Sequence, residues 1–231
     1  MPLSNVRFDE APFRFSGNVY GTLLNHRDAL AALGAAASAA PYQAPPRAVV
    51  LYVKPRNTLI GPGDDVPVPA DAPELEVGAS LGLVIGRTAC RVREADALDH
   101  LAGYTIVNDV SVPHASLYRP QIRAKARDRS CPIGPGVVGR MAIADPGVLA
   151  VRVYVDGRLV HRNRTDGLIR PAARLIAEVS DFMTLFPGDV LMTGVAHGAP
   201  KVRAGQHVAI EIDGLGRLEN RFVAEPELQT P

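Results

Sequence analysis

Four basic side chains alternate with other residues in one short stretch of the chain: Arg123, Lys125, Arg127 and Arg129. If this stretch is extended, all four project to one face, because successive side chains of a strand point in opposite directions. Arginine binds carboxylates through paired hydrogen bonds, and a lysine ammonium can hold an oxyanion. This basic row of four residues could therefore bind a small acid that carries several carboxylates. It could equally be the solvated edge of a sheet, where basic residues prevent strand pairing.

The composition excludes several classes of protein. The 231 residues suffice for one large domain, or for one domain with a small N-terminal lobe. Lys and Arg number 25 against 24 Asp and Glu, so no global field attracts nucleic acid or a membrane. Cys90 and Cys131 form neither a zinc-type cluster nor a disulfide framework, which is typical of a cytoplasmic protein. The charged N-terminus does not resemble a signal peptide, and no apolar run is long enough to cross a membrane.

Short strands separated by turns predict the scaffold that must position these groups. Apolar runs predict strands over residues 18–24, 48–53, 81–85, 104–110 and 190–193. Asp-Gly steps predict hairpin turns within 151–160 and 208–223. Helices are expected over 94–101, over 168–182, and after residue 24, where Asn25 or Asp28 would cap a helix that stops at Pro41. This pattern favours a β-rich α+β fold of curled sheets, with a small N-terminal lobe and linker over 1–46 and the main domain over 47–231.

Five segments, in this order, resemble motifs of the fumarylacetoacetate hydrolase family. They are KPRNTLIG at 54–61, LVIGR at 83–87, AGYTIVNDVS at 102–111, the stretch 125–135 that contains CPIGP, and LFPGDVLMTG at 185–194. Together they extend over about residues 48 to 223. The resemblance implies the fold of that family, a mixed β-sandwich or roll.

Within the family, further segments are similar to the amino-terminal half of the isomerase/decarboxylases of homoprotocatechuate (4-hydroxyphenylacetate) catabolism. They are NHR at 25–27, PYQAPP at 41–46, KPRNT at 54–58, YRP at 118–120 and KARD at 125–128. This resemblance implies decarboxylation of 5-carboxymethyl-2-oxo-hex-3-ene-1,7-dioate and isomerisation of 2-hydroxyhepta-2,4-diene-1,7-dioate. It also implies a homodimer, or a heteromer with a homologous metal-binding subunit, because the metal ligands belong to the carboxy-terminal half.

The metal site that the resemblance implies is incomplete in this sequence. In the family, a Glu-x-Glu pair and the aspartate of an Asn-Asp step hold a divalent cation, Mg²⁺ or Mn²⁺, which stabilises an enolate. Here the two glutamate positions are Gly78 and Ser80, and only Asp109 remains. We therefore expect a weak or absent cation site, with Asp109 either as its one protein carboxylate or as a hydrogen-bonded group at a strand end.

The resemblance assigns further site residues. Lys125 takes the place of the family's catalytic-site lysine, and Lys125 and Asp109 form the expected catalytic pair. The basic row, the loop before Lys125 and two family motifs supply the expected substrate-binding set: Arg123, Arg127, Tyr118, Arg119, Arg56, Thr193 and Gly194. Arg56 could equally form a structural salt bridge. The His and Glu of the family's lid helix fall on Ala29 and Ala32, so no general base is identified, and His26 is either a substitute or a surface residue.

Three functions remain open at this level. The chain could be an enzyme subunit of the isomerase/decarboxylase type, or a catalytically impaired pseudoenzyme that completes a heteromer with a metal-binding homologue. It could also be a metal-independent tautomerase in which Lys125 and Asp109 transfer the proton. Hydrolysis of a diketone is the least expected family activity, because the sequence offers neither the full ligand set nor a general base.

Overall fold

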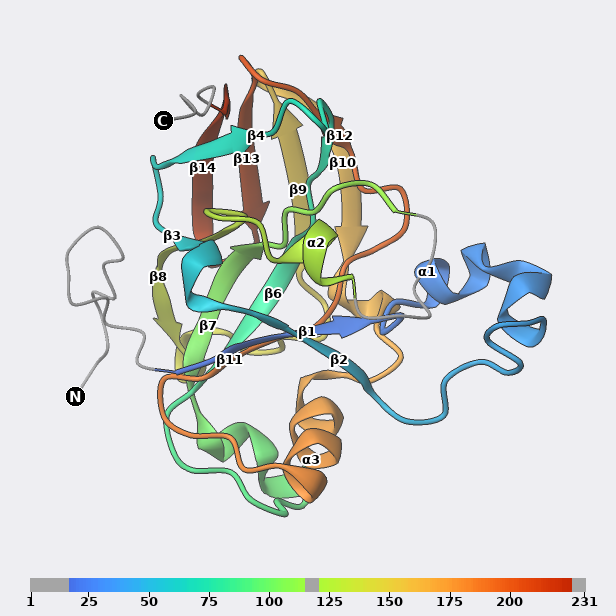
Figure 1. Ribbon diagram of the computed structural model, residues 1–231. Helices are drawn as coiled ribbons and strands as arrows, with labels where there is room; N and C mark the ends of the chain where they lie inside the picture. The colour runs from blue at the N-terminus through green and yellow to red at the C-terminus, as the bar shows by residue number, and fades with distance from the viewer. Residues whose placement is uncertain (1–16, 115–120, 226–231) are drawn as a thin grey trace.

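Two sheets dominate the computed structural model, which describes residues 17–114 and 121–225 (Figure 1). The larger sheet has the strand order β2-β1-β11-β6-β7-β8-β3, and the smaller has the order β10-β9-β13-β14-β4. The larger sheet consists of β1 (Val19–Leu23), β2 (Val50–Lys54), β3 (Leu59–Ile60), β6 (Ala79–Ile85), β7 (Leu101–Asn108), β8 (Cys131–Gly139) and β11 (Val190–Met192). The smaller consists of β4 (Asp65–Val68), β9 (Ala150–Val155), β10 (Arg158–Arg164), β13 (His207–Ile212) and β14 (Gly216–Ala224). A third, two-stranded sheet pairs β5 (Leu75–Glu76) with β12 (Lys201–Val202).

The helices are few and short. The α-helices are α1 (Arg27–Ala32), α2 (Ile122–Lys125) and α3 (Ala172–Phe182). Short 3₁₀ helices are η1 (Gly34–Ser38), η2 (Arg56–Thr58), η3 (Glu94–His100), η4 (Arg140–Ala142) and η5 (Thr165–Gly167). The β-rich α+β fold that the sequence predicts is confirmed. In Figure 1, α1 and η1 project from the side of the molecule, whereas α3 packs beneath the larger sheet and contacts η3.

Apolar side chains fill the space between the sheets. Strand β6 is buried along its whole length, because β11 and β7 flank it and side chains cover both of its faces. The larger apolar cluster joins residues of β6 and β7 to residues of β9, β13 and β14. A smaller cluster around Val84, Val107 and Val190 covers the other face of the larger sheet. Because side chains pack closely on both faces of β6, the position of Ser80 within this strand, and of Gly78 just before it, is fixed.

Several predicted elements are confirmed, and one cap is wrong. The hairpins β9–β10 and β13–β14 turn at the predicted Asp-Gly steps. Helix α1 has His26 at its N-cap position and no side-chain cap. Asn25 instead donates to the carbonyls of Arg170 and Thr193, and its Oδ1 accepts from the Arg170 amide. A buried amide that meets three backbone groups of distant segments stabilises the fold more than a cap on a six-residue helix would.

Strand β1 belongs to the larger sheet, although it precedes the expected domain boundary at residue 46. It pairs in parallel with β11 and antiparallel with β2. The segment before the boundary therefore supplies a strand to the main sheet, and α1 follows from it directly. The division of the chain at residue 46 remains a prediction.

Candidate active site

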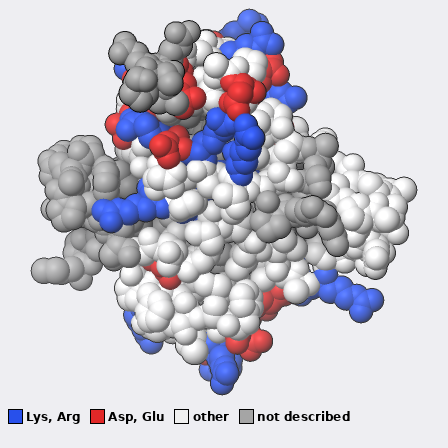
Figure 2. Space-filling model, viewed as in Figure 1, with Lys and Arg blue, Asp and Glu red and all other residues white. Residues whose placement is uncertain are grey.

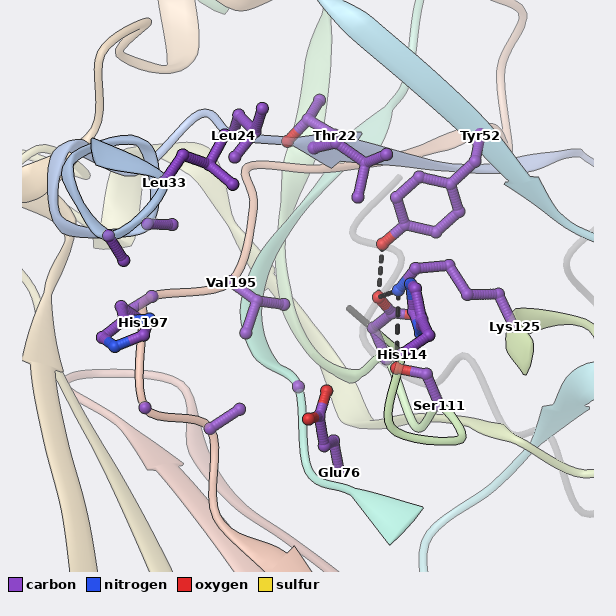
Figure 3. Close-up of a pocket in the computed structure, with 18 of the residues that line it drawn as sticks. Thr22, Leu24, Leu33, Tyr52, Glu76, Ser111, His114, Lys125, Val195 and His197 are labelled. Carbon is purple, nitrogen blue, oxygen red and sulfur yellow. Dashed lines mark hydrogen bonds and ion pairs between the residues drawn. The ribbon is translucent and has the colours of Figure 1, made fainter. Parts of the chain in front are cut away.

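A cavity of about 470 Å³ lies where β1, β2 and α1 face β5, the end of β7 and the loop over residues 195–201 (Figure 3). Its wall is apolar on the side of α1, where Ala29, Ala32 and Leu33 contribute, and polar on the opposite side. The polar and ionisable lining residues are Thr22, Tyr52, Glu76, Asp109, Ser111, His114, Lys125, His197 and Lys201. Of the sequence-predicted site residues, the structure brings Asp109 and Lys125 together here.

Asp109 is fixed by the backbone at the end of β7. Its amide donates to the carbonyl of Gly78 at 2.9 Å, and the amide of Gly78 donates to the side chain of Asn108 at 3.1 Å. The carboxylate is almost fully buried. Asn108 and Asp109 thus link the end of β7 to Gly78 by hydrogen bonds. These bonds direct the Asp109 carboxylate toward the inner end of the cavity.

Three side chains surround the Asp109 carboxylate. The Lys125 ammonium donates to Oδ2 at 2.8 Å, and the Tyr52 hydroxyl donates to the same oxygen. The Lys54 ammonium lies 3.1 Å from Oδ1, an ion-pair contact without hydrogen-bond geometry. Two positive charges therefore face one negative charge, and the cluster carries a net charge of +1 within the protein.

The two lysines of the cluster differ in their surroundings. Lys54 is 1% exposed and also donates to the carbonyls of Val110 and Lys125 and to the hydroxyl of Ser130, so it has no capacity left for a ligand. Lys125 is 9% exposed, lines the cavity, and has its ammonium 4.5 Å from the centre of the Tyr52 ring. Lys54 thus holds the cluster in place, while Lys125 presents the positive charge to the cavity.

The charges of the cluster fix its protonation. Burial by itself would raise the pKa of Asp109, but the ammonium groups of Lys125 and Lys54 and the hydrogen bonds from Lys125 and Tyr52 outweigh it and hold that pKa below its ordinary value. Burial, followed by the charge of Asp109, raises the pKa of Tyr52, so this hydroxyl stays protonated and donates. Burial also raises the pKa of the nearby Cys131 thiol to about 12, so Cys131 offers no thiolate nucleophile.

The residues at this site do not fit the metal site that the sequence resemblance implies. A Cβ added at Gly78 would lie 2.5 Å from the carbonyl oxygen of Asp109, so the strand leaves no room for a glutamate there without a backbone shift. The Ser80 hydroxyl accepts from the amide of Gly194 at 3.2 Å. Both Asp109 oxygens already face ammonium groups. Among residues 17–114 and 121–225, no group of three or more His, Cys, Asp and Glu side chains is arranged to hold a metal ion.

The expected extended row of basic residues is wrong. Residues 122–125 form the short helix α2, in which side chains two residues apart do not share a face, and Lys125 at its end contacts Asp109. Arg123 and Arg127 both pair with Asp71, and Arg129 lies near Asp64, so these three side chains project away from Lys125. Figure 2 accordingly shows basic and acidic side chains next to each other over this part of the surface.

The other residues of the expected substrate-binding set also lie outside the lining of the cavity, as far as the structure describes them. Arg56 is exposed in η2. Thr193 and Gly194 contribute backbone groups, since the Thr193 carbonyl accepts from Asn25 and the Gly194 amide donates to Ser80. Tyr118 and Arg119 lie outside the described residues.

Helix α1 carries Ala29 and Ala32, the two positions at which the resemblance places the His and Glu of the family's lid helix. Ala29 and Ala32 line the cavity, so neither supplies an acid or base there. His26 does not line the cavity, because its ring pairs with Asp28 at 2.6 Å and lies 3.2 Å from the carbonyl of Arg164. It anchors the start of α1 and is nearly buried, so neither of the two sequence-based alternatives for His26 describes it fully.

Three contributors to the site were not identified from the sequence: Lys54, Tyr52 and Glu76. A signal existed for Lys54, because a lysine that ends a strand of buried type needs a buried partner. A signal also existed for Glu76, which lies two residues before Gly78 and therefore on the same side of an extended chain. Nothing in the sequence pairs Tyr52 with Asp109, since 57 residues separate them.

A family model and known proteins match most of this chain. The profile of the family described as fumarylacetoacetate (FAA) hydrolase C-terminal matches residues 18–223. The chain is 40% identical over 214 residues to the 4-hydroxyphenylacetate degradation bifunctional isomerase/decarboxylase of Escherichia coli, with 93% of this chain and 49% of that protein covered. The chain thus spans about half the length of the isomerase/decarboxylases that it matches.

Solved structures share the fold. The 5-carboxymethyl-2-hydroxymuconate delta-isomerase of Mycobacterium smegmatis superimposes with a TM-score of 0.76 at 32% identity, covering 92% of this chain and 81% of that one. The fumarylpyruvate hydrolase of Pseudomonas aeruginosa, in complex with Mn²⁺ and pyruvate, gives a TM-score of 0.79 at 25% identity, covering 97% of both chains. Within the described part of the chain, no helix has the length and apolar character needed to cross a membrane.

Proposed function

The chain belongs to the fumarylacetoacetate hydrolase family, and we propose that it is an isomerase/decarboxylase subunit that acts on small oxo-dicarboxylates. The proposed substrates are those of the enzymes it resembles. These are 2-hydroxyhepta-2,4-diene-1,7-dioate for isomerisation and 5-carboxymethyl-2-oxo-hex-3-ene-1,7-dioate for decarboxylation. Relatives whose names describe isomerases and isomerase/decarboxylases support this choice of reaction class.

One observation carries the proposal: the Lys125 ammonium, held by Asp109, is presented to a cavity of substrate size. Both reactions pass through an enolate of the 2-oxo group. In the isomerisation, the enol hydroxyl loses a proton and a carbon of the diene gains one. In the decarboxylation, the electron pair of the broken C–C bond moves into the same oxo group as CO₂ leaves. A fixed ammonium beside the oxygen stabilises the negative charge in both cases.

The remaining wall supports binding of a partly apolar chain with acidic ends. Ala29, Ala32 and Leu33 offer contact surface for the carbon skeleton, and the exposed Lys201 lines the cavity as a second cation. The net positive charge of the cluster around Asp109 favours an anionic ligand over a neutral one. In this proposal, Asp109 orients Lys125 and takes no proton itself.

The cofactor and partner assignments belong to the same proposal. Relatives in the family bind divalent cations, as the Mn²⁺ complex of the fumarylpyruvate hydrolase illustrates. For this chain we propose a site that binds such cations weakly or not at all, in which Lys125 supplies the positive charge. We further propose a cytoplasmic protein that forms a homodimer or pairs with a homologous metal-binding subunit.

A second candidate function is that of a pseudoenzyme partner. The closed space at Gly78 and the engaged hydroxyl of Ser80 favour it, because neither position supplies the carboxylate that the family resemblance places there. In that case the cavity would be a remnant, and activity would reside in a metal-binding homologue. Co-purification with such a homologue, together with an inactive isolated chain, would distinguish this function from the first.

Replacing Lys125 with Met tests the first proposal. The variant keeps the length of the side chain but removes the charge, so we expect kcat/KM for the dienol to fall by about 100- to 1,000-fold. Arg129→Met is the matched control, because it removes a cation four residues away that pairs outside the cavity, and it should retain activity. A folded Lys125→Met variant that turns over substrate at the wild-type rate would remove Lys125 from the reaction.

A further inference from the structure

A second carboxylate, that of Glu76, lines the same cavity as Asp109. Its backbone is fixed on both sides. The Glu76 amide donates to the carbonyl of Ser111 at 2.8 Å, and the Ser111 amide donates back to the carbonyl of Glu76 at 3.2 Å. Glu76 also opposes Lys201 across the β5–β12 pair. The direction of its side chain is therefore set by the sheet and not by a mobile loop.

The alternation of the strand brings Glu76 into the cavity. Glu76 and Gly78 both line it, whereas Val77 between them is buried in the apolar core. Figure 3 shows the Glu76 carboxylate pointing into the open space, between the His197 segment and the group formed by Lys125 and Ser111. Gly78 offers no carboxylate to the cavity, but Glu76 offers one from the same face of the strand, two residues earlier.

Glu76 differs from Asp109 in being unpaired. Within the described part of the chain, no hydrogen bond or ion pair reaches its carboxylate, and the side chain is partly exposed. Asp109 cannot accept a proton readily, because two ammonium groups and a hydroxyl stabilise its charged form. Proton transfer at carbon needs a group that is free to gain and lose a proton beside the substrate.

The two histidines of the lining are less well placed. The Nδ1–H of His114 donates to the carbonyl of Val112 at 2.8 Å, which leaves Nε2 as the basic atom, and this atom is buried in the wall. His197 is exposed, and Figure 3 shows it on the far side of the cavity from Lys125. Glu76 lies between the two sides.

We propose that Glu76 is the catalytic acid and base of this site, an inference that rests on the isomerase function proposed above. The Glu76 carboxylate takes the proton from the enol hydroxyl, and the oxygen becomes a dienolate that the Lys125 ammonium stabilises. The resulting carboxylic acid then gives the same proton to a carbon of the diene. The double bonds shift, the 2-oxo product forms, and Glu76 returns to its charged state. One proton moves from oxygen to carbon, and no oxidant or reductant is needed.

Hydrogen–deuterium exchange isolates this step. The probe is 2-oxoadipate, an enolisable 2-oxo dicarboxylate, incubated in D₂O with the full chain and followed by NMR at the carbon beside the oxo group. Glu76→Gln keeps the shape of the side chain but cannot carry the proton. Glu74→Gln is the matched control, because Glu74 lies two residues away, pairs with Arg203 and does not line the cavity.

We expect Glu76→Gln to lower the exchange rate at least about 100-fold, whereas Glu74→Gln leaves it unchanged. The dissociation constant of 2-oxoadipate, measured by titration calorimetry, should stay within about threefold of wild type in both variants, which shows that the site is intact. Exchange by Glu76→Gln at the wild-type rate would overturn the role of Glu76 while leaving the proposed function in place. Exchange by neither wild type nor variant would overturn the proposed function, and the role of Glu76 with it.

Discussion

Two carboxylates face one cavity, and they differ in burial and in pairing. Asp109, at the inner end, is buried and meets Lys54, Lys125 and Tyr52. Glu76, nearer the rim, is partly exposed, and no partner reaches it within the described part of the chain. A buried charge must be paired, and pairing removes its freedom to exchange protons. The inner carboxylate therefore organises the site, and the outer one is available for chemistry.

The same contrast bears on the proposed function, in which Lys125 supplies the positive charge of the site. Gly78 and Ser80 add no negative charge beside Asp109, and two lysines balance the Asp109 charge. A divalent cation at Asp109 would compete with both ammonium groups for that carboxylate. The positive charge of the site is thus part of the chain itself.

The largest effect should follow from breaking the inner region at Lys54. Lys54→Met leaves Asp109 with less compensation and leaves the carbonyls of Val110 and Lys125 without a donor. We expect the free energy of unfolding to fall by about 3–5 kcal/mol, measured by urea denaturation. Glu76→Gln in the same assay should change it by less than about 0.5 kcal/mol. Equal effects of the two variants would break the contrast between a structural and a free carboxylate.

A smaller effect should come from filling the space at Gly78. A methyl group there would meet the Asp109 backbone, so Gly78→Ala should lower the free energy of unfolding by about 1–3 kcal/mol. Gly136→Ala is the control, because no heavy atom lies within 4 Å of a Cβ at that position. A neutral Gly78→Ala would mean that the strand has room for a larger side chain, and would weaken the argument against a metal site.

The inner region should also leave a signature in the pH dependence of stability. The pKa of Asp109 in the folded state lies below its ordinary value of 3.8. The Asp109 charge therefore contributes fully to the free energy of unfolding above pH 3.8, and this contribution is lost as the pH falls through the folded-state pKa. The difference in unfolding free energy between wild type and Asp109→Asn should therefore be constant from about pH 7 to 5 and shrink below about pH 4. A difference that does not depend on pH would show that the Asp109 charge is not stabilised as described.

The smallest effect is expected at the surface next to α2. Arg123 is exposed and pairs with Asp71, so Arg123→Ala should change the unfolding free energy by less than about 0.5 kcal/mol and KM by less than about twofold. Steady-state kinetics with the dienol checks this directly. A tenfold rise in KM would return Arg123 to the substrate site, as the sequence pattern alone suggests.

Much of the fold follows from local sequence. Alternating and apolar runs, with Asp-Gly turns between them, identify both hairpins and most central strands, because burial and turn chemistry act over a few residues. The family motifs identify the chain as a member of its family, and the comparisons confirm this. The pairing of β1 with β11 joins segments about 170 residues apart, which no local pattern reveals.

The site was only partly predictable for the same reason. Asp109 and Lys125 were found through motifs, and the structure places them in contact. The basic row was misjudged because alternation in sequence implies a shared face only in a strand, and residues 122–125 form a helix. Lys54 and Tyr52 reach Asp109 from β2, a contact that depends on the packing of distant strands. The catalytic roles of Lys125 and Asp109 stay predictions.

In the proposed mechanism, the ammonium of Lys125 supports enolate chemistry in this chain without a bound metal ion. The most direct measurement is turnover of the dienol by the purified chain, followed by loss of its absorbance, first with magnesium and then with an excess of chelator. This role of Lys125 predicts equal rates, within about twofold, in the two conditions. Turnover that requires magnesium would contradict it, and so would a folded chain that is inactive in both conditions, which would favour the pseudoenzyme partner instead.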